Sequence, residues 1–340
     1  MFKILKILAM LCALLVAVGA GGFYWLASSP IPLASERAEF HVTYGKGMSA
    51  VAREIAASGV PVDPWMLILL GKVYGVESSI KAGSYEISRG VTPLELLRKL
   101  TSGDVTQGEI VFIEGWNFRQ IRARLEAHPD LRHDTRGLPE AEIMRMIGAP
   151  ASSAEGMFFP DTYLFSKQTS DVDVLARAYR AMQQQLSREW AARAAGLPYA
   201  DPYQALIMAS IVEKETGRQE DRSYVASVFV NRLRLGMRLQ TDPTVIYGVG
   251  EDFDGNLRKR DLLADTPYNT YTRAGLPPTP IAMPGLASLR AAVNPAPGRA
   301  LYFVARGDGS SQFSETLEQH NQAVNRYQRR GQRTRDGGDK

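Results

Sequence analysis

One run of this chain reads Ala205-Leu206-Ile207-Met208-Ala209-Ser210-Ile211-Val212-Glu213-Lys214-Glu215-Thr216. Apolar or small residues fill positions 205–212, and two carboxylates follow them. Asp201-Pro202 is typical of a helix start, with Gln204 at the reciprocal capping position, and Gly217 is typical of a residue that follows a helix. The run therefore predicts a helix that opens at Asp201-Pro202 and stops before Gly217.

The two glutamates of this helix project toward faces that are normally buried. At about 100° per residue, Glu213 lies in line with the small residues Ala209 and Ser210, whereas Glu215 lies beside the bulky Met208. Burying a carboxylate disfavours its ionised form, and a general acid that works near neutral pH needs a raised pKa. Because the small neighbours leave room for a substrate, Glu213 is the candidate acid, and Glu215 is more typical of packing.

Other interpretations of this region stay open. The glutamates could end the helix on a solvated rim, where cations are available as partners: Lys214, Arg218 and Arg222. Ser210 has no histidine at a spacing that indicates a catalytic triad. Glycoside hydrolysis by two carboxylates is also compatible with the sequence, with Asp242 or Glu155 as the second acid.

The stretch at 236–297 is rich in turn-forming residues yet keeps aromatic and amide side chains. Long loops of this kind are often functional. Tyrosine, asparagine, glutamine and threonine suit sugars, because a sugar ring stacks on an aromatic face and its hydroxyls bond to amides. The alternative is an ordered cluster of loops that packs its own aromatic residues.

The N-terminus predicts a membrane helix. Lys3 and Lys6 precede an uncharged stretch at 7–27, which is long enough at about 1.5 Å per residue to span a bilayer core of roughly 30 Å. Tyr24 and Trp25 lie at its far end, where aromatic side chains favour the membrane interface. The lysines predict that residues 1–6 are cytoplasmic and that the body is exported. The alternative is a cleaved signal peptide, although the apolar run continues beyond its candidate site at 18–20.

Composition and length limit the remaining classes of function. The 340 residues suffice for two folded units, and the net charge of +4 does not single out nucleic acid, for which no basic stripe with interleaved aromatics is present. The only cysteine, Cys12, lies in the apolar N-terminal run, so an intrachain disulfide is excluded. No zinc-type cluster of ligands stands out, and we expect neither a metal nor a cofactor.

Periodicity and capping signals predict an α+β protein. Residues 28–37 read as a linker, 38–105 as a small α+β module, and 329–340 as a disordered tail. In the module we expect strands at 39–44 and 84–88, helices that begin at Ser49 and at Asp63-Pro64, and a capping box formed by Thr92 and Glu95. Beyond it we expect a strand at 110–113, a helix capped by Asn117, mainly helical structure over 126–200, a helix at 222–235, a strand at 301–305 and a helix from 314 to about 330.

Further motifs follow the order that they have in one known family. They are Glu114-Gly115-Trp116, Glu155-Gly156, Phe159-Pro160-Asp161-Thr162-Tyr163, Asn231-Arg232-Leu233, the run at 239–248, Tyr268-Asn269-Thr270-Tyr271, Gly275-Leu276-Pro277-Pro278, Pro284-Gly285, Leu301-Tyr302-Phe303-Val304 and His320-Asn321. Together with 209–216 they cover about residues 40 to 325 and resemble the endolytic murein transglycosylases of the MltG (YceG-like) family. The ordered set carries the resemblance, since any one of these short motifs is a weak signal.

The resemblance implies a domain layout. It implies one N-terminal membrane helix, a LysM-like module at 38–105 and a larger mixed α+β catalytic domain at 106–328, in a protein of the cell inner membrane with its body in the periplasm. The module departs from an ordinary LysM sequence, because the asparagine-containing segment is not evident and the residues from Trp65 to Val76 fill that region. Whether the module binds sugar is therefore left open.

The resemblance also implies a reaction. One essential glutamate, which matches Glu213, protonates the oxygen between N-acetylmuramic acid and the next N-acetylglucosamine, and then deprotonates the muramic 6-hydroxyl as a 1,6-anhydro ring closes. The candidate substrate-binding residues are Gln240, Thr241, Asp242, Tyr247, Tyr268 and Asn269. The candidate supporting residues are Glu155, Ser210 and Glu215. Peptidoglycan strands are the expected substrate, and peptidoglycan synthases are expected partners. The alternatives are a hydrolytic muramidase and a non-catalytic peptidoglycan-binding scaffold.

Overall fold

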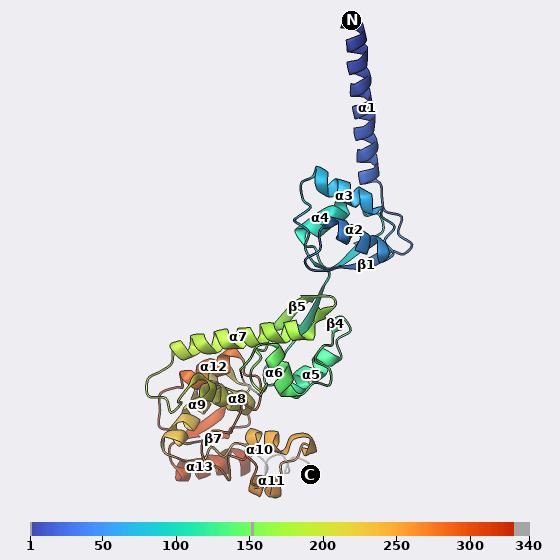
Figure 1. Ribbon diagram of the computed structural model, residues 1–340. Coiled ribbons are helices and arrows are strands. Elements are labelled where there is room, and N and C mark those ends of the chain that lie inside the picture. Colours follow the sequence, from blue (N-terminus) through green and yellow to red (C-terminus); the bar gives the residue numbers. More distant parts are fainter. Residues whose placement is uncertain (1, 151–152, 330–340) are drawn as a thin grey trace, which may run out of the picture. The chain divides into compact units, whose positions relative to one another are not determined.

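The computed structural model describes residues 2–150 and 153–329 (Figure 1). The predicted tail at 329–340 lies, from residue 330 onward, outside this described part. The chain forms two compact units: one contains the residues up to Glu109 together with Leu164–Thr169, and the other contains Ile110–Tyr163 and the residues from Ser170 onward. Helices and short paired strands occur in both, so the prediction of a mixed α+β protein is confirmed.

The first unit begins with the apolar helix α1 (Phe2–Ser28). Within it, Met10–Ser28 is long and apolar enough to cross a membrane, a test that a signal sequence near the N-terminus also passes. The end of α1 packs on the unit, because Ala27 is buried in its hydrophobic core and Phe23 lies against that core. The existence of one candidate membrane helix is thus confirmed.

The body of the first unit is a two-stranded antiparallel sheet covered by helices. Strands β1 (Arg37–Val42) and β2 (Gly83–Ser88) pair in a register that places Phe40 opposite Tyr85, and the two rings stack with centroids 5.6 Å apart. The covering helices are α2 (Met48–Ala57), α3 (Pro64–Val73) and α4 (Pro93–Ser102). Because α2 and α3 lie between the two strands in the sequence, the order is strand–helix–helix–strand.

Capping signals located two helices correctly and misplaced a third. Thr92 and Glu95 form the predicted capping box of α4, and Asn117 caps α5 (Phe118–Glu126) together with Gln120. Helix α2, in contrast, begins at Met48 after the extended backbone of Gly47, so the predicted cap Ser49 lies inside its first turn.

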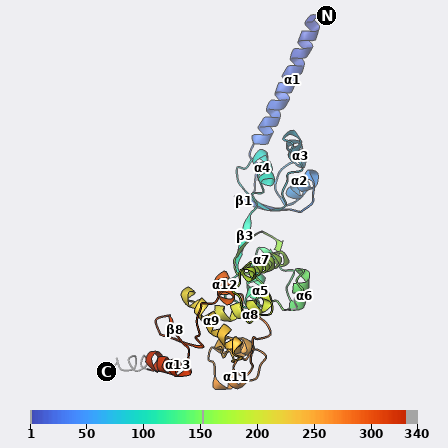
Figure 2. The same cartoon turned by 90° about the vertical axis from the view of Figure 1, so that its left-hand side faces the viewer.

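The second unit is built around the helix α8 (Pro202–Glu215). This helix packs against α7 (Asp171–Ala191), α9 (Gln219–Arg234) and α12 (Leu286–Val293), which lie beside it in Figures 1 and 2. All residues from Ala205 to Val212 are buried, as befits a helix that is apolar on every side. The remaining helices of the unit are α6 (Glu140–Met146), α10 (Asp242–Val249), the 3-10 turn η1 (Gly250–Asp252), α11 (Lys259–Leu263), α13 (Leu317–Val324) and the π-helical turn η2 (Asn325–Arg329).

The remaining strands are short and form three pairs. Strand β3 (Gln107–Val111) pairs with β5 (Thr162–Ser166), β4 (Leu131–Arg132) pairs with β6 (Thr169–Ser170), and β7 (Tyr302–Ala305) pairs with β8 (Ser311–Ser314). The strand predicted at 110–113 begins earlier than expected, and β8 occupies the predicted start of the last helix.

The prediction that 236–297 is rich in turns missed the helices that form there, which are α10, the short α11 and α12. Helix α10 begins at Asp242-Pro243, a start signal that the chain also uses at 63–64 and 201–202. Helix α12 follows Gly285, and its buried face consists of small residues and Leu289, a pattern too short to stand out. The error matters because α12 packs directly on α8 and α9.

Candidate active site

Glu213 lies in the last turn of α8, where α9 and the start of α12 meet it. Only 6% of its side chain is exposed. Its Oε2 accepts a hydrogen bond from the Gly285 backbone N–H at 3.0 Å, and its Oε1 lies 3.4 Å from Nη2 of Arg222 on α9. The expected burial and the alternative pairing with Arg222 therefore both occur, and the carboxylate is held from two sides.

A second carboxylate, Glu114, lies next to Glu213. A Cβ atom on Gly285 would lie 1.8 Å from Oε1 of Glu114, so this side chain rests on the bare Cα of the glycine. Partial burial, and then the negative charge of Glu213, raise the pKa of Glu114, while Arg222 opposes the shift. Two carboxylates thus lie near one arginine, and Glu114 binds a proton more readily than an isolated glutamate does.

The pairing of two distant segments places Glu114 there. The Gly115 N–H donates to the Met283 carbonyl at 2.8 Å, and the Met283 N–H donates to the Trp116 carbonyl at 2.7 Å. Lys214 Nζ also donates to the Gly115 carbonyl at 3.3 Å. In the sequence, Glu114 stands out only as part of the short motif Glu114-Gly115-Trp116. Its nearness to Glu213 depends on pairing across the fold, which no local spacing reveals.

Glu215 points to a different group of residues. Its Oε1 accepts a hydrogen bond from the hydroxyl of Thr241, the residue that precedes α10. Burial raises the pKa of Glu215, and this hydrogen bond lowers it in part. Asp242 adjoins the group and accepts a hydrogen bond from the hydroxyl of Tyr271. The structure thus joins three of the predicted site residues, but around Glu215 and not around Glu213.

Glu155 is the most enclosed of the candidate carboxylates. Both of its oxygens lie 3.2 Å from the Phe118 backbone N–H, and Oε2 accepts a hydrogen bond from the Tyr247 hydroxyl at 3.0 Å. Burial raises the pKa of Glu155 to about 7, although these hydrogen bonds oppose the shift. Next to it, Gly156 has a φ of +77° and no room for a Cβ, which would lie 2.4 Å from Pro280. Because its pKa is about 7, the Glu155 carboxyl group can gain or lose a proton near neutral pH.

A cavity of about 940 Å³ opens beside Glu155. Its wall contains Tyr247 and Tyr268, whose rings meet edge to face with centroids 4.7 Å apart, and the Tyr268 hydroxyl is 2.9 Å from Oγ1 of Thr279. Gly115 and Lys214, the neighbours of Glu213, also line it. The cavity thus combines aromatic faces with hydrogen-bonding groups at the edge of the Glu213 site.

Two other candidate side chains, those of Asn269 and Ser210, bond to the protein's own backbone, and a third, Gln240, is exposed. Asn269 is fully buried, donates to the carbonyls of Asp261, Leu262 and Ala264, and accepts from the Tyr271 N–H. The Ser210 hydroxyl donates to the Ile207 carbonyl at 2.7 Å and accepts from the Ile281 N–H at 3.0 Å. Gln240 is exposed, with a φ of +51° that is unusual for a residue with a side chain.

The chain belongs to the YceG-like family, which matches residues 40–326. A protein of Bacillus subtilis named endolytic murein transglycosylase is 30% identical over 304 residues, which cover 84% of each chain. A protein of Streptococcus pneumoniae with the same name is 26% identical and covers 92% of this chain, which spans 63% of that protein. A crystal structure of a yceG-like protein from Listeria monocytogenes covers 85% of this chain and 99% of its own, at 29% identity and a TM-score of 0.53.

Proposed function

We propose that this protein is an endolytic lytic transglycosylase that cleaves the glycan strands of peptidoglycan, with Glu213 as its acid and base. The observation that carries the proposal is the buried Glu213 carboxylate, held by a backbone N–H and an arginine at the edge of an aromatic cavity. The name that the relatives share supports the same reaction.

The contacts of Glu213 fit a group that gives up a proton and later takes one back. Protonated Glu213 donates to the oxygen between N-acetylmuramic acid and the next N-acetylglucosamine, and the C1–O bond breaks. The hydrogen bond from Gly285 and the charge of Arg222 then stabilise the carboxylate. This carboxylate takes the proton of the muramic 6-hydroxyl as that oxygen bonds to C1, which closes the 1,6-anhydro ring without water. Acid–base help of this kind contributes about 10²–10⁴-fold.

The other site residues divide into two roles in this proposal. Tyr247 and Tyr268 line the cavity and offer ring faces for sugar stacking, and Glu155 orients Tyr247 through its hydrogen bond. Thr241, Asp242 and Glu215 hold the start of α10, while Ser210 and Asn269 hold neighbouring loops. Gln240 is exposed and free to meet a strand beyond the cavity.

The first unit tethers the enzyme in this proposal. Helix α1 anchors the protein in the cell inner membrane with residues 1–6 in the cytoplasm, and the catalytic body at 106–328 lies in the periplasm. The strand–helix–helix–strand order of β1, α2, α3 and β2 supports a LysM-like module at 38–105. An enzyme tethered in this way meets newly made strands and the synthases that extend them.

Mass spectrometry of the products tests the reaction. The full chain in detergent is incubated with isolated glycan strands, next to Glu213→Gln and to Glu220→Gln, which changes an exposed glutamate at the start of α9. We expect wild type and Glu220→Gln to release fragments one water lighter than reducing-end fragments, and Glu213→Gln to release none.

Two other outcomes would replace the proposal. Reducing-end fragments would indicate a hydrolytic muramidase with a water-activating carboxylate, for which Glu114 beside Glu213 is a candidate. Binding without cleavage by wild type, on strands that another enzyme cleaves, would indicate a scaffold.

A further inference from the structure

Helix α3 has one face in the core of the first unit and one face in solvent, and both are apolar. Met66, Leu67 and Leu70 are buried between α3 and its neighbours. The outer face presents Trp65, Leu69 and Val73, which follow each other at intervals of one helical turn, and Tyr74 comes directly after the helix. Their exposed fractions are 55%, 38%, 61% and 51%.

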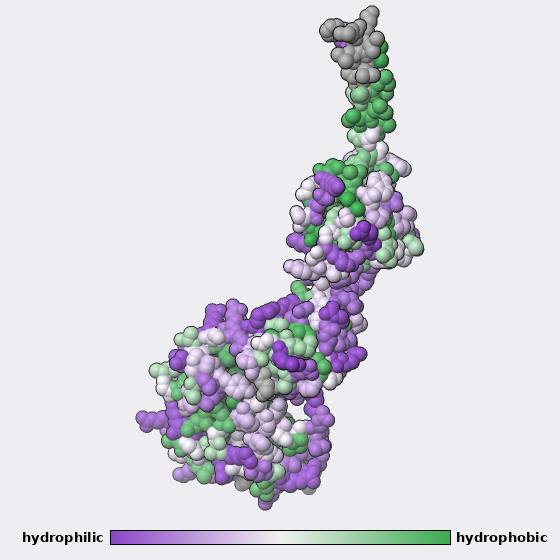
Figure 3. Space-filling model, viewed as in Figure 1, coloured by the Kyte–Doolittle hydropathy of each residue, from purple (hydrophilic) through white to green (hydrophobic). Residues whose placement is uncertain are grey.

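This outer face is an exposed apolar patch on a folded unit. Figure 3 shows it as hydrophobic surface over α3, close to the apolar end of α1. Large contiguous apolar patches on soluble proteins mark surfaces that bind another apolar surface. The aromatic residues Trp65 and Tyr74 at its two ends are of the type that favours the boundary between water and hydrocarbon.

The attachment of α1 places this face close to the membrane surface. The first unit takes up the last turns of α1 through Phe23 and Ala27, while Tyr24 and Trp25 stay exposed at the predicted interface level. The linker that follows α1 is bonded to the first unit directly after the helix ends, because the Ile31 N–H donates to the Val91 carbonyl at 2.8 Å. In Figures 1 and 2, α3 lies at the end of the unit next to α1, and β1 lies at the opposite end.

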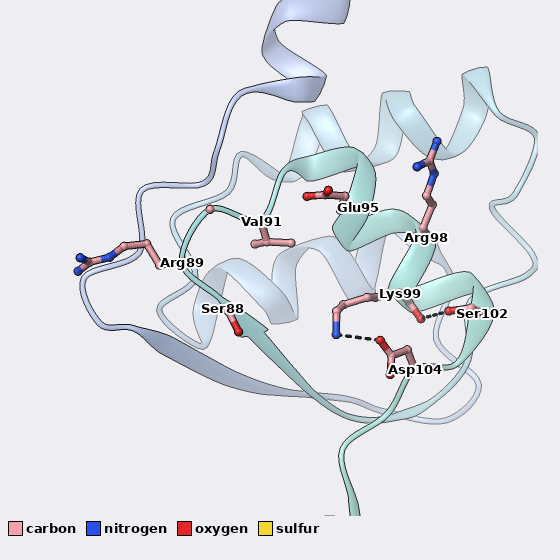
Figure 4. A pocket seen from close by; sticks show the side chains of 9 residues that line it. Ser88, Arg89, Val91, Glu95, Arg98, Lys99, Ser102 and Asp104 are labelled. Atoms are coloured by element: carbon pink, nitrogen blue, oxygen red, sulfur yellow. Dashed lines mark hydrogen bonds and ion pairs between the residues drawn. The ribbon is translucent and has the colours of Figure 1, made fainter.

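Positive charge accompanies the patch. Lys72 is exposed on α3 itself, between Leu69 and Val73 in the sequence. Arg98 is exposed on α4 and, in Figure 4, extends toward the end of the unit where α1 enters. The neighbouring Lys99 is instead used by Asp104, 2.8 Å away. Lysine and arginine at the edge of an apolar face are typical of helices that lie on anionic lipid surfaces.

We propose that α3 is an interfacial helix, whose face formed by Trp65, Leu69, Val73 and Tyr74 rests in the lipid surface of the membrane that α1 spans. The proposal rests on the anchoring role assigned to α1. A glycan is the weaker match for this face, because Leu69 and Val73 offer no hydrogen bonds to sugar hydroxyls. The consequence is that the first unit contacts the bilayer at two places and cannot swing freely about the end of α1.

Fluorescence quenching in vesicles tests this contact in the full chain. The only native cysteine is Cys12 in α1, so Cys12→Ser gives a background in which Leu69→Cys carries a bimane label. The matched control is Arg37→Cys on β1, another exposed position of the same unit. Vesicles contain an anionic lipid and a lipid with a quencher near the headgroup. We expect the lipid quencher to reduce emission at position 69 at least about threefold more than at position 37, and aqueous iodide to show the reverse order.

A label on native Cys12 distinguishes a failure of the membrane anchor α1 from a failure of the interfacial helix α3. Quenching of that label by a deep acyl-chain quencher reports that α1 is inserted. Quenched Cys12 with equal iodide access at positions 69 and 37 would overturn the interfacial helix alone. Unquenched Cys12 would overturn the anchor and the interfacial helix together. Protection of position 69 that appears only with added glycan strands, or only at high protein-to-lipid ratios, would assign the face to sugar or to a second copy and overturn the lipid assignment.

Discussion

Helices α3 and α8 begin with the same signal and share an almost unbroken apolar sequence. Asp63-Pro64 opens α3 and Asp201-Pro202 opens α8. The surroundings differ: α8 is enclosed by α7, α9 and α12, so every residue from Ala205 to Val212 is buried, whereas α3 lies at the edge of its unit with one apolar face uncovered. The same kind of local sequence can therefore form either a buried core helix or a helix with an exposed apolar face. Which one forms depends on whether other helices of the chain pack around it.

The enclosure of α8 also explains why carboxylates can work at its end. A rigid, buried helix holds Glu213 and Glu215 in fixed positions, and the elements that enclose it bring Arg222 and Gly285 to Glu213. Preorganised partners of this kind need no rearrangement during the reaction. On α3, in contrast, the exposed apolar face carries no carboxylate.

The most direct test of this difference is one substitution in each helix. Leu206→Ala removes a fully buried side chain from α8, and we expect it to lower the free energy of unfolding by about 2–5 kcal/mol. Leu69→Ala on the exposed face of α3 should change it by no more than about 0.5 kcal/mol. Urea denaturation of both variants in detergent measures the two values, and equal losses would contradict the comparison.

The pH dependence of stability tests the enclosure around the α8 site. Burial raises the pKa of Glu155 from 4.5 to about 7, so the folded protein binds a proton that the unfolded chain has lost at intermediate pH. The stabilisation that this proton gives the folded protein is fully present below about pH 4.5 and disappears as the pH rises through 7. By linkage it amounts to on the order of 3 kcal/mol.

Glu155→Gln isolates that contribution, because glutamine keeps the shape of the side chain and does not titrate. Denaturation should be measured at about pH 5 and about pH 8. We expect the free energy of unfolding to fall less between these two pH values for Glu155→Gln than for wild type. Parallel behaviour of the two proteins would mean that Glu155 is not enclosed as described.

Gly285→Ala tests the partners that enclosure brings to Glu213. The new Cβ would overlap the Glu114 carboxylate and displace it, while the φ of −77° at this position suits alanine. Since small displacements at a reacting centre are costly, we expect strand cleavage to fall by about tenfold or more, with little change in stability. Gly217→Ala, where a Cβ would meet no atom within 4 Å, is the matched control and should keep full activity in the same product assay.

The smallest expected difference lies at the two helix starts. The Asp201 carboxylate accepts a hydrogen bond from the Gln204 N–H at 2.9 Å, whereas the Asp63 side chain makes no capping hydrogen bond. Asp201→Ala should therefore cost about 1 kcal/mol, and Asp63→Ala a few tenths. Thermal unfolding followed by circular dichroism would resolve the pair, and a larger loss for Asp63→Ala would show that the shared signal does not act as described.

Local chemistry made much of the fold predictable. Caps at Thr92 and Asn117, the apolar run of α8 and the membrane-length run of α1 are each encoded within a few turns of chain. The same start signal at Asp242-Pro243 was available for α10 but was not used, because the surrounding glycine and proline residues favoured turns. Helix α12 is too short and too rich in alanine to be recognised without α8 and α9 beside it.

The site was predictable only in part, for a related reason. The carboxylates at the end of α8 stood out because charge at the end of a buried helix is unusual. Arg222 was among the cations available as partners, but Glu114 and Gly285 were not recognised, because they reach Glu213 from two separate segments. Asn269 suited a sugar by its chemistry, yet its amide is engaged with backbone groups of its own loop. Its direct contact with substrate stays a prediction.

The return of residues 164–169 to the first unit sets an order of assembly. The Ser84 hydroxyl donates to the Lys167 carbonyl at 2.6 Å, and the Lys167 ammonium lies 2.6 Å from the Glu39 carboxylate, so the returning segment closes the unit. A growing chain cannot make these contacts until residue 169 has been synthesised. By then residues 110–163, which belong to the second unit, have already been synthesised. The first unit is therefore completed only after part of the second unit has been synthesised, and a fragment ending at Glu109 would be an incomplete domain.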